Sequence, residues 1–185
     1  MRGPPAEAVG RPRPAPPVKL VLGVLAARPE LLGEVRVVAE KEFGRIELES
    51  RVAPWRATRY YEEELGPEPY RQFFVFSDPV DPADLAELKL RTNELEGIWS
   101  VGGRRRVNLD PGYLDLARLV LASTKDAAHR VYLGKGIYAE VTLVFADGRF
   151  RPFPHTYPDY ASPEVRAFFE TAREAWKRQR RERAR

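Results

Sequence analysis

The sequence predicts an α+β fold: a ferredoxin-like β-α-β-β-α-β sandwich that is extended by a C-terminal strand, a β-hairpin and a helix. Three patterns support this prediction. Apolar runs of strand length and amphipathic runs of helix length follow one another in the order β-α-β-β-α-β. Residues 130–140 alternate around Gly134-Lys135-Gly136 as a hairpin does. Apolar side chains recur at helical spacing in residues 162–176, so we expect helices to cover one face of a largely antiparallel sheet.

The composition is that of a soluble globular protein. Of the 185 residues, 43% are hydrophobic and 31% are charged, which is enough apolar material for the core of one ordinary domain. The absence of cysteine excludes disulfides, thiolate zinc sites and a cysteine nucleophile. No apolar run approaches the roughly 20 residues of a membrane span, and residues 1–17 lack the apolar core of a secretory signal. We therefore expect a bacterial cytoplasmic protein with no membrane partner.

The positive charge is concentrated at the two ends of the chain. The net charge is +4, but residues 177–185 alone carry six basic side chains and one acidic, and the Pro-rich residues 1–17 carry three and one. The remainder is therefore slightly acidic, which argues against a broad nucleic-acid-binding face on the body. We expect a disordered Pro/Arg-rich leader at 1–17, a single α+β domain at 18–176 and a basic tail at 177–185.

The first three elements follow from local patterns. Residues 18–26 form a short run rich in Val and Leu, which predicts a buried strand. Pro29 suits the first turn of a helix, apolar residues then recur at helical spacing up to Phe43, and Gly44 stands where a helix ends. Residues 45–52 alternate between apolar and acidic side chains, as in a half-buried strand.

The next stretch contains the clearest helix. Residues 53–69 predict a loop or a short helix, and residues 70–77 predict a strand. Asp81 suits the N-cap and Pro82 the first position of a helix. The face that this helix buries is expected to contain Leu85, Leu88, Thr92, Leu95 and Trp99.

Residues 104–110 alternate again, with the polar side chains of Arg106, Asn108 and Asp110 on one face. A row of polar groups on one strand face, roughly 6–7 Å apart, suits contact with a ligand. Residues 110–113, Asp-Pro-Gly-Tyr, predict a turn, which is an alternative role for Asp110. Residues 117–123 then predict another strand.

The expected hairpin pairs Leu133 with Ile137 across a three-residue loop, so that Tyr132 opposes Tyr138 and Arg130 opposes Glu140. The other face is apolar and is expected to be core: Val131, Leu133, Ile137, Ala139, Val141 and Leu143. Two interpretations of Arg130 and Glu140 stay open. They form a cross-strand ion pair that contributes roughly 0.2–1 kcal/mol, or they line a pocket in which Arg130 binds an anion.

Several longer words resemble a bacterial domain-of-unknown-function family: "TNELE" at 92–96, "RRVNLDPGYL" at 105–114, residues 121–143 and "TYPDY" at 156–160. The likeness runs from about Val18 to the C-terminal helix. The resemblance implies a small stand-alone cytoplasmic protein and carries no activity over to this sequence.

The candidate site residues fall into two groups. Those that can exchange a proton in catalysis are Asp110, Asp126, His129 and Glu140. Those that can hold a ligand are Arg106, Asn108, Lys125, Arg130, Lys135, Tyr157 and Asp159. Asp126 is the expected partner of His129, whose tautomer it would fix, although a simple loop histidine capped by a local carboxylate fits equally.

Two functions stay open. The first is a small enzyme acting on a phosphate-bearing ligand, a nucleotide or an RNA end, with cations that hold phosphate and a carboxylate or His129 as base. The second is a non-catalytic module that binds RNA or protein. The cofactor is unknown. Asp110, Asp126, Glu140 and Asp159 are oxygen ligands that Mg²⁺ accepts, but no spaced metal motif supports a metal site, and the sequence does not predict an oligomeric state.

Overall fold

The computed structural model describes residues 12–55, 62–183 and 185. The first eleven residues of the predicted leader, and residues 56–61 of the predicted loop, lie outside the described residues. Residues 12–17 have no regular secondary structure and are exposed. No helix in the described part of the chain is both long enough and apolar enough to cross a membrane.

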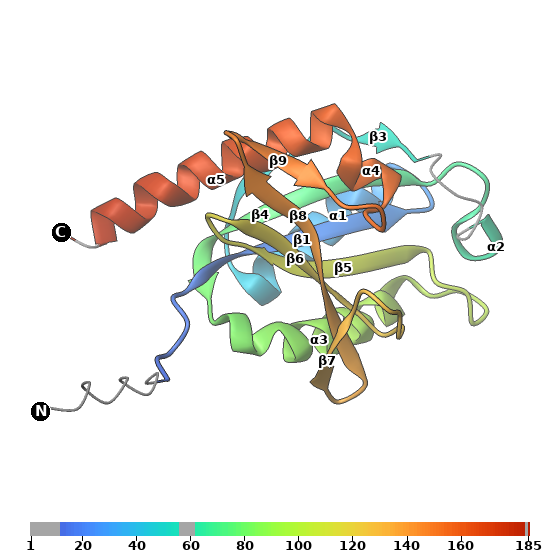
Figure 1. The fold of residues 1–185 in the computed structure, drawn as a ribbon. Coiled ribbons are helices and arrows are strands. Elements are labelled where there is room, and N and C mark those ends of the chain that lie inside the picture. Colours follow the sequence, from blue (N-terminus) through green and yellow to red (C-terminus); the bar gives the residue numbers. More distant parts are fainter. Residues whose placement is uncertain (1–11, 56–61, 184) are drawn as a thin grey trace, which may run out of the picture.

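The centre of the molecule is a nine-stranded sheet in which every pairing is antiparallel (Figure 1). The strand order is β2-β4-β1-β5-β6-β8-β7, with β3 beside β4 and β9 beside β8. The strands are β1 (Val18–Ala26), β2 (Ile46–Glu49), β3 (Ala53–Pro54), β4 (Tyr70–Val80), β5 (Val107–Leu114), β6 (Arg118–Ser123), β7 (Val131–Gly134), β8 (Ile137–Ala146) and β9 (Arg149–Pro152). The predicted α+β fold class is confirmed.

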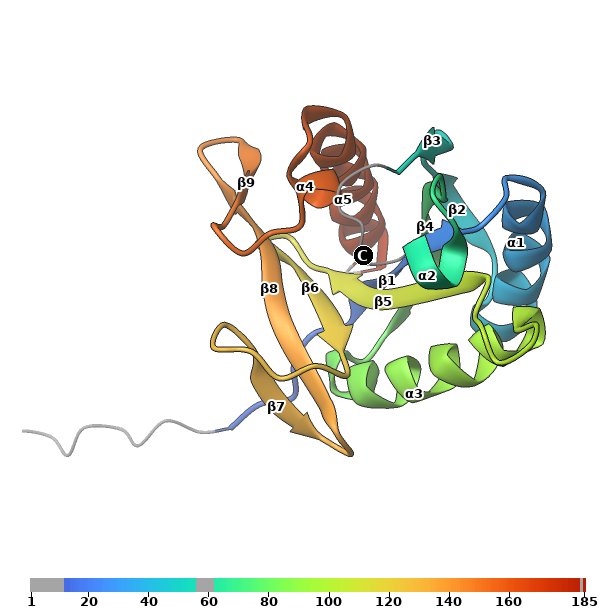
Figure 2. The ribbon, with the colours of Figure 1, turned by 90° about the vertical axis from the view of Figure 1, so that its right-hand side faces the viewer.

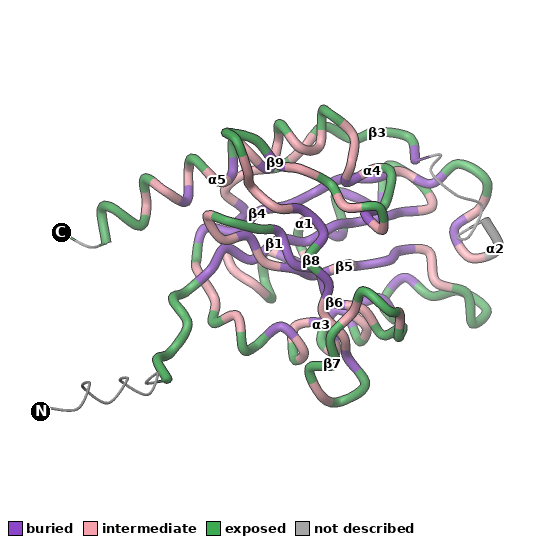
Figure 3. The backbone as a smooth tube through the Cα atoms, viewed as in Figure 1, coloured by how far each residue is buried: buried purple, intermediate pink, exposed green. Residues whose placement is uncertain are grey.

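Helices lie on both faces of the sheet, not on one as expected (Figure 2). They are α1 (Glu30–Phe43), α2 (Glu62–Leu65), α3 (Leu85–Glu96), α4 (Pro158–Ala161) and α5 (Pro163–Arg183), with single 3₁₀ turns η1 (Pro82–Asp84) and η2 (Gly97–Trp99) beside α3. The helices α1 and α3 share one core with alternate residues of β1, and α5 packs on the opposite face. Strand β1 is therefore buried along its whole length (Figure 3).

The first helix begins and ends as predicted. Pro29 is its N-cap residue, and Gly44, with φ of 90°, closes it in a conformation that favours glycine. Helix α5 also begins where the sequence predicts, at Pro163, and continues beyond Trp176 to Arg183. Most of the basic residues near the C-terminus are therefore on its last turns.

The predicted turn at residues 110–113 is wrong, because β5 continues through it. Gly112 serves a different purpose there: a Cβ atom at this position would clash with the carbonyl oxygen of Val120 on β6. The glycine therefore permits close approach of two strands. The chain turns later, at Asp115, whose carboxylate accepts hydrogen bonds from the backbone N–H groups of Ala117 and Arg118, both at 2.7 Å.

The hairpin forms, but with a shorter loop than expected. Tyr132 opposes Tyr138 as predicted, with ring centroids 5.2 Å apart. Gly134, not Leu133, pairs with Ile137, so the loop is Lys135-Gly136 and the ladder is irregular at Leu133. Both loop residues have positive φ, which is typical of two-residue hairpin turns.

The predicted core face of this hairpin is only partly buried. Ile137 and Leu143 are buried as expected, whereas Val131 is 68% exposed, and Leu133 and Val141 are exposed as well. Strand β7 is the last in the order of the sheet, and the apolar cluster at the start of α3 reaches β6 and β8. Strand β9, which follows the turn Asp147-Gly148, is an element that the sequence reading missed.

Candidate functional site

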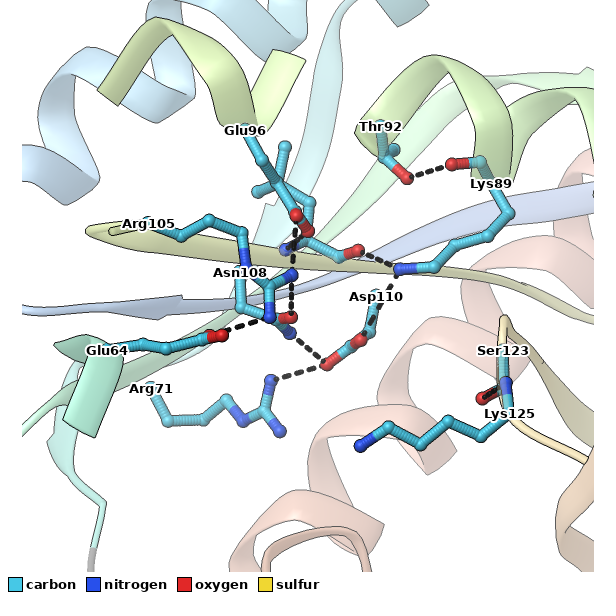
Figure 4. Close-up of polar contacts among 11 residues, drawn as sticks. Glu64, Arg71, Lys89, Thr92, Glu96, Arg105, Asn108, Asp110, Ser123 and Lys125 are labelled. Atoms are coloured by element: carbon cyan, nitrogen blue, oxygen red, sulfur yellow. Dashed lines mark hydrogen bonds and ion pairs between the residues drawn. The ribbon is translucent and has the colours of Figure 1, made fainter. Parts of the chain in front are cut away.

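A cavity of about 330 Å³ opens between strands β4, β5, β6 and β8 and helix α3, and most of its charged side chains contact one another (Figure 4). Its charged lining residues are the cations Arg71, Lys89, Arg105, Lys125 and Arg130 and the acids Glu96, Asp110 and Glu140. Asn93, Asn108, Trp55, Tyr157 and Tyr160 also line it. The cavity therefore combines positive charge with aromatic surface, as small-molecule sites do.

Asp110 is at the centre of this group. Asn108, two residues earlier on β5, donates a hydrogen bond of 2.9 Å to its Oδ2 atom. The Nη1 atom of Arg71 lies 3.5 Å from Oδ2, and the Nζ atom of Lys89 lies 3.8 Å from Oδ1. The side chain of Asp110 is 24% exposed, so a ligand can reach this carboxylate. Strand alternation places Asn108 and Asp110 on one side of the sheet, as the sequence predicts.

Helix α3 contributes two charged residues that the sequence reading missed, Lys89 and Glu96. Both are buried, and both bond to the backbone of Leu109. The Nζ atom of Lys89 donates a hydrogen bond of 2.8 Å to the carbonyl oxygen of Leu109, and the backbone N–H of Leu109 donates one of 2.7 Å to the carboxylate of Glu96. Burial raises the pKa of the Glu96 carboxyl, against the opposing charge of Lys89. Lys89 and Glu96 recur at helical spacing with Leu85 and Thr92, and this spacing is the sequence pattern that indicates their place on the buried face of the helix.

Arg105 completes the α3 side of the cavity. It donates hydrogen bonds of 2.7 Å to Glu96 and 2.6 Å to Glu64, and a longer one of 3.3 Å to Asn108. Glu64 belongs to the acidic stretch that begins α2, so this part of the predicted loop anchors a cavity residue.

Arg71 on β4 is held from behind by Asp159. The Oδ2 atom of Asp159 accepts hydrogen bonds from Nε at 2.7 Å and is paired with Nη2 at 2.6 Å. Burial acts to lower the pKa of Arg71, but the negative charges of Asp159 and Asp110 outweigh burial and raise it. The guanidinium therefore stays charged at the edge of the cavity.

Tyr160 lies beside Arg71 and is 1% exposed. Its hydroxyl has no hydrogen-bond partner among the described residues, and burial raises its pKa well above the ordinary value. A Cβ atom on Gly23 would lie 2.5 Å from this hydroxyl, so a glycine on β1 is what gives the tyrosine its place.

Arg130 is the third arginine of the cavity that is paired with an acid, in this case Glu140. Nε of Arg130 donates a hydrogen bond of 2.8 Å to Glu140, and Nη1 donates one of 2.8 Å to the backbone oxygen of Lys125. The two side chains are 6% and 2% exposed, so the ion pair is buried. Thr142 also donates to Glu140, at 3.3 Å. Arg130 precedes β7, so the contact does not come from paired strand positions.

His129 contacts a different carboxylate from the one predicted. Its Nε2 atom lies 3.2 Å from Glu140, while Asp126 is exposed, so the expected Asp126–His129 pair is not formed. The ring of His129 stacks on His155 with centroids 4.3 Å apart. His129 therefore lies next to the cavity, on the far side of Glu140, and does not line it.

The candidates predicted from the sequence thus divide. The cavity is lined by Asn108, Asp110, Lys125, Arg130, Glu140 and Tyr157. Asp159 contacts the cavity residue Arg71, and His129 contacts the cavity residue Glu140. The remaining three, Arg106, Asp126 and Lys135, do not line the cavity, and Lys135 pairs with Glu87 of α3.

The four carboxylates considered for Mg²⁺ do not gather at one point. Asp110 and Glu140 line the cavity, whereas Asp126 is exposed outside it and Asp159 is paired with Arg71. Within the part of the chain that the structure describes, no three His, Asp or Glu side chains are close enough together to hold a metal ion.

Comparison with known proteins gives one result. The model of a protein family described as "Domain of unknown function (DUF4416)" matches residues 16–176. The match covers the whole sheet and ends within α5. No curated protein and no solved structure matches the chain.

Proposed function

The chain belongs to this domain-of-unknown-function family, and we propose that its cavity binds a phosphate-bearing small ligand on which the protein acts as an enzyme. One observation carries the proposal: each arginine of the cavity is held by a buried or nearly buried acid. Asp159 holds Arg71, Glu96 holds Arg105 and Glu140 holds Arg130, with the acid side chains 10%, 3% and 2% exposed.

Holding a guanidinium in this way prepares it to bind an anion. A free arginine loses side-chain entropy when it binds, and a fixed one has lost it already. Arginine has five N–H donors in a planar fork, so a carboxylate behind it leaves donors for a phosphate in front. Arginines fixed in this way support phosphate as the ligand group more strongly than one flexible lysine would.

Lys125 supplies a further cation from the other side. In Figure 4 the side chain of Lys125 extends toward the guanidinium of Arg71 from the opposite side, and the carboxylate of Asp110 lies near both. A phosphate in this space would have positive charge on both sides. We place it there, between Lys125 and Arg71, with Arg130 beside it.

Asp110 is the group best placed to act on such a ligand. It is partly exposed, faces the cavity and is oriented by Asn108. A carboxylate in this position accepts the proton of a water or hydroxyl beside the phosphate, which is general base catalysis. Glu140 and Glu96 are buried, and both oxygens of each carboxylate accept hydrogen bonds within the protein, which argues against either as the base.

Two lysines provide a matched test. Lys125 lines the cavity, and Lys135 is an exposed lysine on the same hairpin region that does not. Calorimetric titration with inorganic phosphate should show binding to the parent protein and to Lys135→Gln, and at least tenfold weaker binding to Lys125→Gln. Absence of phosphate binding, or equal loss in both variants, contradicts the proposal.

A second candidate function is a non-catalytic module that binds RNA. The observation that favours it is the end of α5, where Arg178, Arg180, Arg181 and Arg183 are exposed on turns that project beyond the sheet (Figure 1). Phosphate contacts of this kind weaken steeply as salt rises. Removal of residues 177–185 should abolish salt-sensitive RNA binding if this function is correct, and should leave phosphate binding in the cavity unchanged.

We propose further that β1, α1, β2, β4, α3 and β5 form a ferredoxin-like unit. The order β2-β4-β1-β5, with antiparallel pairing throughout, supports it. The bacterial origin and the cytoplasmic location stay predictions from the sequence.

A further inference from the structure

A second hollow lies directly beside the cavity. It is a groove of about 850 Å³ between the first half of α5 and residues 49–55. Its floor and walls are largely apolar, and the side chains that make them so include Val52, Pro54, Phe73, Val165 and Phe168. Phe73 is buried, and Val165 and Phe168 are half-buried, so the groove is an opening into the core beneath α5.

The groove and the cavity share two walls. Trp55 and Arg71 line both of them. Arg71 therefore lies between a polar space on one side and an apolar space on the other. Asp159, which holds Arg71, lines the groove, and its Oδ1 atom is buried without a hydrogen-bond partner among the described residues.

The charges of the two spaces differ in sign. The cavity lining contains five cations and three acids, whereas the groove lining contains Glu49, Asp159 and Glu164 against Arg51 and Arg71. A phosphate is favoured in the cavity and disfavoured in the groove. An uncharged apolar group has the opposite preference, because the groove offers it surface that is otherwise wet.

We infer that the ligand of the cavity carries an apolar portion, and that this portion lies in the groove while the phosphate lies in the cavity. The ligand is then an organic phosphate whose organic part is hydrophobic. This inference rests on the proposed function, since the phosphate is what anchors the molecule. Arg71 lies where the two portions join, and Trp55 packs along the apolar one.

A series of straight-chain phosphates tests the inference. Inorganic phosphate and n-butyl, n-hexyl and n-octyl phosphate are titrated into the full-length protein by calorimetry, with n-hexanol as the probe that lacks phosphate. Each methylene buried in the groove should tighten binding by up to about fourfold. The n-hexanol should bind far more weakly than n-hexyl phosphate.

Two substitutions on α5 locate the effect. Ala167 is exposed and lines the groove, so Ala167→Glu places a charge there without disturbing the core. Ala175→Glu is the control, eight residues along the same helix and outside both linings. Ala167→Glu should remove the dependence on chain length and leave inorganic phosphate binding unchanged, whereas Ala175→Glu should change neither.

The outcomes separate the two proposals. If inorganic phosphate binds but chain length has no effect, or Ala167→Glu leaves the chain-length effect intact, the apolar portion is wrong and the phosphate site stands. If n-hexanol binds as tightly as n-hexyl phosphate, the groove acts without the cavity and the inference fails. If no phosphate compound binds, the proposed function and this inference both fail.

Discussion

Arg71 and Asp159 form a buried two-point ion pair, although they lie 88 residues apart in the sequence. Oδ2 of Asp159 is 2.7 Å from Nε of Arg71 and 2.6 Å from its Nη2. The side chain of Arg71 is 8% exposed and that of Asp159 is 10% exposed. The pair joins β4 to α4. It also forms the wall between the cavity and the groove, so it is both a structural tie and the feature that positions a candidate ligand-binding cation.

Removal of one member of this pair should be costly. Asp159→Ala leaves Arg71 buried without its main counter-charge, and breaking such a pair typically destabilises a protein by about 3–5 kcal/mol. Urea unfolding measures the change. The exposed Asp126 provides the control, since Asp126→Ala should change the free energy of unfolding by less than about 0.5 kcal/mol. Equal effects of the two substitutions would show that the ion pair contributes little.

A methyl group at residue 23 should be destabilising. The Cβ atom of Gly23→Ala would lie 2.5 Å from the hydroxyl of Tyr160 and 3.2 Å from Nη1 of Arg71, and such crowding costs roughly 1–3 kcal/mol. Adding Tyr160→Phe removes the nearer atom and should restore most of the loss. Gly33 in α1 is the matched control, because a Cβ there meets nothing within 4 Å.

For that control, Gly33→Ala should stabilise the protein by roughly 0.5–1 kcal/mol, since alanine favours a helix over glycine. Chemical denaturation of the three variants separates the cases. The packing argument is refuted if Gly23→Ala and Gly33→Ala shift stability in the same direction.

Asp110→Asn should tighten the binding of inorganic phosphate while abolishing any turnover of a phosphate ligand. The substitution keeps the shape of the side chain and removes a negative charge that faces the bound phosphate. Even with the screening of bulk water, two unit charges about 4 Å apart repel by about 1 kcal/mol, so the loss of this repulsion should tighten binding by at least about fivefold. Asp126→Asn, outside the cavity, should change neither quantity. Weaker phosphate binding in Asp110→Asn would place the phosphate elsewhere.

Glu96 should make the folded state less stable as pH rises. Its pKa is raised in the folded state, chiefly by burial, so the folded state holds this proton more tightly than the unfolded state does. The resulting stability is fully present below the ordinary pKa of glutamate and is lost as pH rises through the raised value. Melting temperatures from pH 4 to 7 measure this dependence.

The variant Glu96→Gln cannot titrate, so the difference between its melting temperature and that of the parent protein should vary with pH. A constant difference for Glu96→Gln would mean that this carboxyl has its ordinary pKa when folded.

The elements that the sequence predicted well depend on neighbouring residues alone. Helix α1 begins after Pro29 and ends at Gly44 because a proline fits a first helical turn and a glycine tolerates positive φ. Tyr132 opposes Tyr138 because the turn between them sets the register. The turn predicted at Pro111-Gly112 was wrong because the role of the glycine depends on a residue distant in local pattern, Val120 of the next strand, and not on its neighbours along the chain.

The sequence by itself determined the order of most helices and strands, the α+β class and the polar row of Asn108 and Asp110, since each depends on local periodicity. The tertiary structure alone decided which charges meet there. Lys89 and Glu96 come from a helix, Arg71 from a strand distant in sequence and Asp159 from the short helix α4 near the C-terminus. Their distances follow from strand order and helix placement, which are set by packing over the whole sheet and not by spacing along the chain.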